Sequence, residues 1–120
     1  MNVREVLNRR LHSHGLSAAT HFDQPHQAVA WFGAMQAQDY LQSKWAIGSR
    51  CKHATDAAIK QAIAERSIVR TWALRGTLQM IAAQDVRWIT QLVGSRMAAR
   101  RARLQDVIQI PTDVSPPFCV

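Results

Sequence analysis

Apolar side chains recur every three or four residues in three segments of the chain, which is the spacing of an amphipathic helix. These segments predict helices over residues 2–14, 25–35 and 55–66. Gly15 follows the first segment as a cap, Pro25 opens the second in its first turn, and Thr55 precedes the third as an N-cap. The second segment is the most apolar, and we expect it at the centre of the core.

Residues 67–80 have a different pattern, rich in β-branched and aromatic side chains, with Gly76 where a hairpin would turn. We expect a two-stranded hairpin in which residues 68–73 pair with residues 77–81. Residues 44–50 are short and mixed, and their two large apolar side chains lie two positions apart, which favours a brief strand.

Two more helices are expected after the hairpin, over residues 85–93 and 96–110, with a break at Gly94. Residues 111–120 contain three prolines and are expected to form an extended tail. Helix, short strand, helix and hairpin is the element order of a winged-helix unit, a variant of the helix-turn-helix. The sequence therefore predicts an α+β, helix-rich fold, with one winged-helix domain and its flanking helices in residues 1–110.

Length and charge add an expectation about partners. A chain of 120 residues is the size of one domain. Its net charge of +7 and pI near 10.8 favour an acidic partner, nucleic acid first among them. Both halves of the chain are basic, so no detachable tail carries the excess. Arginine far outnumbers lysine, which suits bidentate phosphate contacts but also fits a GC-rich genome.

The cysteine count and the N-terminus bear on the cellular setting. Two cysteines exclude a disulfide framework and a four-cysteine zinc site. The first residues carry several charges and lack the apolar run of a signal peptide, and no stretch approaches the ~18 apolar residues of a membrane span. We expect a cytoplasmic protein with no membrane association, no metal and no cofactor.

Gln36 and Gln38 are the first candidate for chemistry. If the chain is extended there, both side chains point the same way, and two amides can orient a water molecule or grip a sugar–phosphate edge. Alternatively, both amides cap the end of the preceding helix. Asp39 is the nearest carboxylate, and it could act as a base or neutralise Lys44 or a nearby arginine.

Arginines of the hairpin and the last helix are the second candidate. Those of the hairpin flank Trp72, and those of the helix share one face at helical spacing, which suits contact with DNA phosphates. The candidate nucleic-acid-binding residues are Arg70, Arg75, Arg96, Arg100 and Arg103. Alternatively, the helical set is a solvated surface, and the hairpin pair is solvated or bonded to Glu65 and Asp85.

Four stretches together resemble the AlkZ-like winged-helix DNA glycosylases. They are FGAMQAQDY at 32–40, WAIG at 45–48, VRTWALRGTL at 69–78 and AAQDVRW at 82–88. Their order and spacing both match, and the resemblance covers about residues 3–108.

The resemblance implies a winged-helix fold, double-stranded DNA as partner, and hydrolysis of the N-glycosidic bond of alkylated or crosslinked purines. The family's catalytic element is a glutamine, an apolar residue, then a glutamine or aspartate, which falls here on Gln36, Ala37 and Gln38. Two oriented amides suit this chemistry, because a cationic alkylated purine leaves readily and needs no strong base.

Two departures from the family pattern leave the activity open. Gln79 stands where family members have a histidine, and family members are longer chains with further winged-helix units. The chain is therefore expected to be a truncated relative that keeps the DNA-binding unit. The alternatives are a non-catalytic DNA-binding or regulatory module, and a fragment that pairs with itself through uncovered apolar surface.

Overall fold

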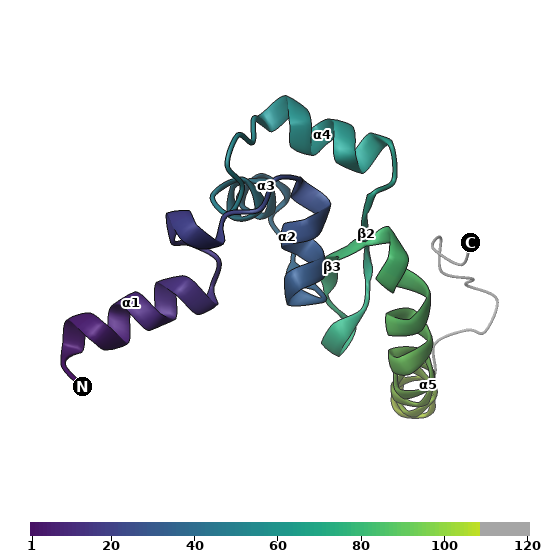
Figure 1. Ribbon diagram of the computed structural model, residues 1–120. Helices are drawn as coiled ribbons and strands as arrows, with labels where there is room; N and C mark the ends of the chain where they lie inside the picture. The colour runs from purple at the N-terminus through teal and green to yellow at the C-terminus, as the bar shows by residue number, and fades with distance from the viewer. Residues whose placement is uncertain (109–120) are drawn as a thin grey trace.

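Five α-helices and three short strands make up residues 1–108, the part of the chain that the computed structural model describes (Figure 1). The tail expected at 111–120 lies outside the described residues, as does the end of the domain expected at residue 110. The helices are α1 Val3–Ser13, α2 Pro25–Phe32, α3 Tyr40–Gly48, α4 Asp56–Ala64 and α5 Ala83–Ile108. The strands are β1 Met35–Gln36, β2 Ile68–Trp72 and β3 Leu78–Ala82.

The three strands form one antiparallel sheet in the order β1-β3-β2. The expected hairpin is confirmed, since β2 pairs with β3 and a single 3-10 turn, Leu74–Gly76, joins them. Strand β1 adds to the free edge of β3, with Met35 opposite Met80. The α+β, helix-rich prediction is confirmed, and the element order and the sheet are those of a winged-helix-like unit.

The short strand was predicted in the wrong place. Residues 44–50 belong mainly to helix α3, whose inward side chains Ser43, Lys44 and Ile47 have helical spacing. The strand comes earlier, at Met35–Gln36, and begins at the last residue of the range expected for the second helix. Helix α2 ends at Phe32 because Gly33 adopts φ +73, a left-handed conformation that glycine tolerates best.

The break expected at Gly94 is also wrong, because α5 runs through it as one helix. A glycine inside a helix costs about 1 kcal/mol relative to alanine, which is too little to end a long helix. As a result the arginines beyond Gly94 continue on the same helical axis that starts at the end of β3.

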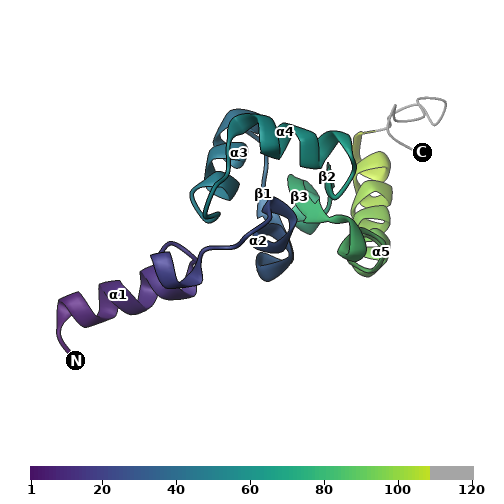
Figure 2. The same cartoon turned by 45° about the horizontal axis from the view of Figure 1, so that its top comes forward.

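The core lies on both faces of the sheet. On one face Met80 and Ile68 pack with α2, α3 and α4, whose most buried side chains include Val29, Ile47 and Ile59. On the other face Ile81 and Ala73 pack with Ile89 of α5. The figures show this arrangement, with α2 and α4 on one side of the strands and α5 on the other (Figures 1 and 2). Neighbouring residues of β3 therefore serve two separate clusters.

Helix α1 projects away from this body and has no buried residue (Figure 1). Its C-terminal end is held by Arg50, whose Nε donates to the carbonyl oxygen of His14 at 2.8 Å. None of the described helices is both long and apolar enough to cross a membrane.

An ion pair between the buried Lys44 and the exposed Asp56 joins α3 to α4. The ammonium group of Lys44 is almost completely buried and bonds to Asp56 at the start of α4, where Lys60 also donates at 2.7 Å. Hydrogen bonds from Lys44 and Lys60 lower the pKa of the Asp56 carboxyl below its ordinary value. The pair therefore favours the ionised carboxylate in the folded state.

This ion pair predicts an acid-sensitive fold. Because the folded-state pKa of Asp56 is depressed, its stabilisation is full above the unfolded-state pKa of about 4 and is lost as pH falls through the lower folded-state value. The urea midpoint should fall between about pH 5 and pH 2, and Asp56→Asn should flatten that fall. Glu5→Gln on the projecting α1 is the control and should keep the wild-type profile.

Candidate active site and nucleic-acid interface

Gln36 and Gln38 lie side by side at the edge of the sheet. Gln36 is the last residue of β1, Gln38 follows two residues later, and both are exposed. The Nε2 of Gln36 donates a hydrogen bond to Oε1 of Gln38. This leaves the Oε1 of Gln36 to accept and the Nε2 of Gln38 to donate toward a ligand. The amides do not cap α2, which ends at Phe32.

The backbone between the two glutamines is held on both sides. The N–H of Ala37 donates to the carbonyl of Leu78 on β3 at 2.8 Å. The carbonyl of Ala37 accepts from Nε and Nη2 of Arg70 at 2.9 and 2.8 Å, and Nη2 also reaches the carbonyl of Gln38 at 3.2 Å. The Arg70 guanidinium also lies over the ring of Tyr40, 5.6 Å from its centroid. Arg70 therefore clamps the glutamine segment.

Asp39 forms no ion pair with Lys44 or an arginine among the described residues. Its carboxylate accepts from the N–H of Gln42 at 3.0 Å and caps the start of α3. Lys44 bonds to Asp56 instead, so the alternative that pairs Asp39 with Lys44 is wrong. The glutamine segment is thus fixed at its far end by a helix cap.

An open hollow faces the two glutamines. We call it the glutamine hollow; its volume is about 510 Å³, and its lining residues are Gln36, Gln38, Asp39, Gln42, Ser43, Trp45 and Ala46. Volumes of 300–1,000 Å³ are usual for small-molecule sites, so a nucleotide base fits. Trp45 is 73% exposed here. The sequence placed Trp45 on a strand. Leu41 and Trp45 are four residues apart, which puts both on one face of a helix, and this spacing could have predicted the exposed face of α3.

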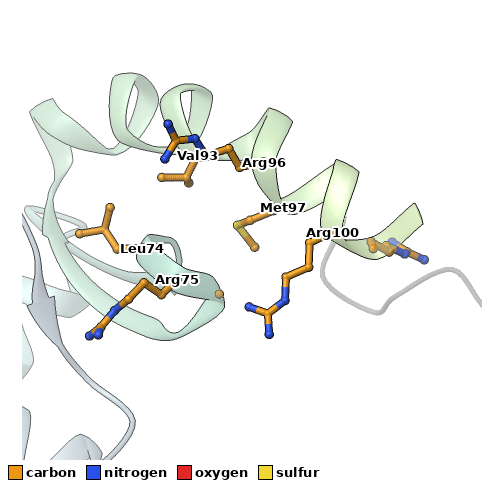
Figure 3. Close-up of a pocket in the computed structure, with 8 residues that line it drawn as sticks. Leu74, Arg75, Val93, Arg96, Met97 and Arg100 are labelled. Carbon is orange, nitrogen blue, oxygen red and sulfur yellow. The ribbon is translucent and has the colours of Figure 1, made fainter. Parts of the chain in front are cut away.

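A second hollow brings together most of the candidate arginines. We call it the arginine hollow; its volume is about 660 Å³, and its lining residues are Leu74, Arg75, Gly76, Val93, Arg96, Met97, Arg100 and Arg101. Arg75 comes from the turn between β2 and β3, and the other arginines come from α5. Figure 3 shows Arg75 and Arg100 extending to the same side, with Met97 between them. The floor is apolar and the rim is cationic, which suits a phosphate backbone.

Two of the candidate arginines lie apart from this hollow. Arg70 bonds to backbone carbonyls beside the glutamines, and Arg103 is exposed on α5 beyond the lining residues. The alternative pairing of Arg70 with Glu65 or Asp85 is wrong, because those carboxylates accept from Gln61 and Trp88. Arg101, which was not among the candidates, joins the rim.

Comparison with known families decides the relationship. The family model described as DNA glycosylase AlkZ-like matches residues 29–111, which is more than two thirds of the chain. The chain belongs to the AlkZ-like DNA glycosylase family. The matched range contains the sheet, both hollows and helices α3 to α5, and it leaves out the projecting α1. No curated protein and no solved structure matches the chain.

The AlkZ-like unit differs from the expected family pattern at Gln79. This residue lies directly opposite Gln36 across β1 and β3, so both side chains are on the same face of the sheet. Its amide is buried and its Nε2 donates to Oγ1 of Thr77 at 2.7 Å. A glutamine therefore fills this position with a satisfied donor, on the face of the sheet that carries Gln36.

Proposed function

We propose that this AlkZ-like unit binds double-stranded DNA and hydrolyses the N-glycosidic bond of cationic, alkylated purine nucleotides. The observation that carries the proposal is the convergence of the Gln36 and Gln38 amides on an open hollow, on a backbone segment held by Arg70. Membership of a DNA glycosylase family supports the reaction class.

The reaction needs positioned polar groups more than a base. When the bond from C1′ to N9 breaks, its electron pair neutralises the positive purine, and an oxocarbenium-like sugar remains. A water molecule adds to C1′ and releases its proton to solvent. The Oε1 of Gln36 can accept from that water, and the pair's dipoles can stabilise the charge on the sugar.

DNA binding rests on the arginine hollow. The turn and α5 present Arg75, Arg96, Arg100 and Arg101 around an apolar floor, and no described carboxylate lines that hollow. Each neutralised phosphate releases counterions, so affinity should depend steeply on salt. Arg103 extends the same basic surface along α5.

Removing one rim arginine should reduce the salt dependence of binding. We expect Arg96→Ala and Arg100→Ala each to weaken duplex binding and to lower the slope of log K against log salt by about 0.9. Helical positions are suitable because alanine is the best helix former, so these substitutions keep α5 intact. Fluorescence anisotropy at several salt concentrations measures the slope. Arg4→Ala on α1 should retain it, and an unchanged slope in the α5 variants would exclude this surface.

The decisive test of hydrolysis is release of a modified base. The protein is incubated with duplex DNA containing N7-methylguanine, and free base is measured by chromatography against spontaneous release. We expect the wild-type protein to accelerate release. Salt-sensitive binding without release would instead establish a non-catalytic DNA-binding module.

A further inference from the structure

All four tryptophans of the chain are exposed, and Trp45 is the one that lines the glutamine hollow. It is 73% exposed, while Lys44 and Ile47 on the opposite side of α3 are buried. An exposed indole that borders a hollow lined by polar side chains offers a ligand there an aromatic face. Its position is fixed, since the Lys44 ion pair and the packing of Ile47 set the rotation of α3.

The same hollow connects Trp45 to the proposed reaction centre. Gln36 and Gln38 line one part of the glutamine hollow, and Trp45 lines another. Helix α3 begins directly after the glutamine segment, at the Asp39 cap. The same cap therefore holds the segment of Gln36 and Gln38 next to the helix that carries Trp45. A base whose sugar is held by the amides is therefore within the space that the indole borders.

The residues that line the glutamine hollow carry one charge, and that charge is negative. The protein carries +7, yet the one charged residue among those described as lining this hollow is Asp39, a carboxylate. A site for phosphate would present cations, as the arginine hollow does. The glutamine hollow instead suits a positively charged ligand, and an aromatic face adds attraction for a cation.

We propose that Trp45 and Asp39 select the positively charged form of the purine, with the base stacked on the indole and its charge facing the carboxylate. This inference rests on the proposed function and names how its substrate is distinguished from normal purines. A neutral purine of the same shape stacks on the indole but gains neither the cation–π attraction nor that of the carboxylate.

Two duplexes separate charge from shape. Both carry a 2′-fluoroarabino sugar that resists cleavage; one holds cationic N7-methylguanine, the other its neutral isostere 7-methyl-7-deazaguanine. We expect the wild-type protein to prefer the cationic duplex about tenfold, Trp45→Ala to reduce this preference to about twofold or less, and Trp45→Phe to retain part of it. Asp39→Asn keeps an N-cap and should lower the preference about threefold.

Matched controls make the result specific. Trp88→Ala removes another half-exposed indole, on α5, and should keep the wild-type preference. A preference that persists in Trp45→Ala would overturn the proposal. Equal loss of binding to both duplexes in Trp45→Ala and Leu41→Ser would also overturn it, because that result indicates an apolar docking face on α3.

The outcome is independent of whether the proposed hydrolysis is correct. Binding to the resistant duplexes is measured without any cleavage, whereas base release is measured on ordinary N7-methylguanine DNA. Release without a Trp45-dependent preference contradicts this inference alone. A Trp45-dependent preference without release contradicts the proposed hydrolysis and supports the binding inference.

Discussion

Replacing Gln38 with alanine should slow the release of N7-methylguanine about 100-fold. Loss of one preorganised donor that stabilises charge in a transition state commonly costs 10²- to 10³-fold in rate. Gln38 both offers its own Nε2 and fixes Gln36 by accepting its hydrogen bond. Single-turnover rates with excess protein measure the effect on the chemical step. Gln84→Ala, an exposed amide at the start of α5, should react at the wild-type rate.

The hydrogen bond between the glutamines also predicts that their effects are not additive. Removing either amide leaves the other without its partner, so Gln36→Ala combined with Gln38→Ala should cost little more than the worse single change. Independent, multiplying effects in the double variant would show that the two amides act separately.

Replacing Arg70 with alanine should slow base release about 30-fold, although Arg70 is expected to touch no reacting atom. Its guanidinium makes three hydrogen bonds to the carbonyls of Ala37 and Gln38, so its loss frees the segment that carries the amides. A misplacement of about 1 Å can cost 10²-fold in rate. Loss of hydrogen bonds from a charged donor should also lower the free energy of unfolding by about 2 kcal/mol.

The salt dependence of DNA binding distinguishes this positioning role from a DNA contact. Arg70→Ala should keep the wild-type salt slope, unlike Arg100→Ala, and Arg70→Lys should recover part of the rate by restoring one donor. Urea unfolding of each variant separates a loss of folded protein from a loss of rate. A reduced salt slope in Arg70→Ala would place this residue on the DNA surface instead.

Local signals in the sequence were sufficient for most elements of the fold. The helix 56–64 was predicted from its Thr55 cap and apolar spacing, and the hairpin from its β-branched residues and glycine turn. The convergence of Gln36 and Gln38 followed from the two-residue repeat of an extended chain. These features depend on residues that are close together in the sequence, so the spacing of residue types can predict them.

The remaining features depend on contacts between distant residues. Lys44 is buried because Asp56, twelve positions later, pairs with it. A charged residue therefore stands at an inward position of α3, and the apolar spacing that predicts a helix is interrupted there. Arg70 reaches Ala37 only because β3 places β1 and β2 on its two sides. Spacing along the chain contains neither fact, so the sequence could not predict the hydrogen bonds of Arg70 to the glutamine segment.

Strand β3 sets a fixed distance in the molecule. Arg75 lies in the turn just before it, and Gln79, beside Gln36, lies four residues further on. Four residues of chain span at most about 14 Å. If the turn binds a phosphate, this strand fixes the distance along the duplex between that phosphate and the base that reaches the glutamines. Lengthening the turn would then move the bound phosphate relative to the glutamines and change which nucleotide reaches them.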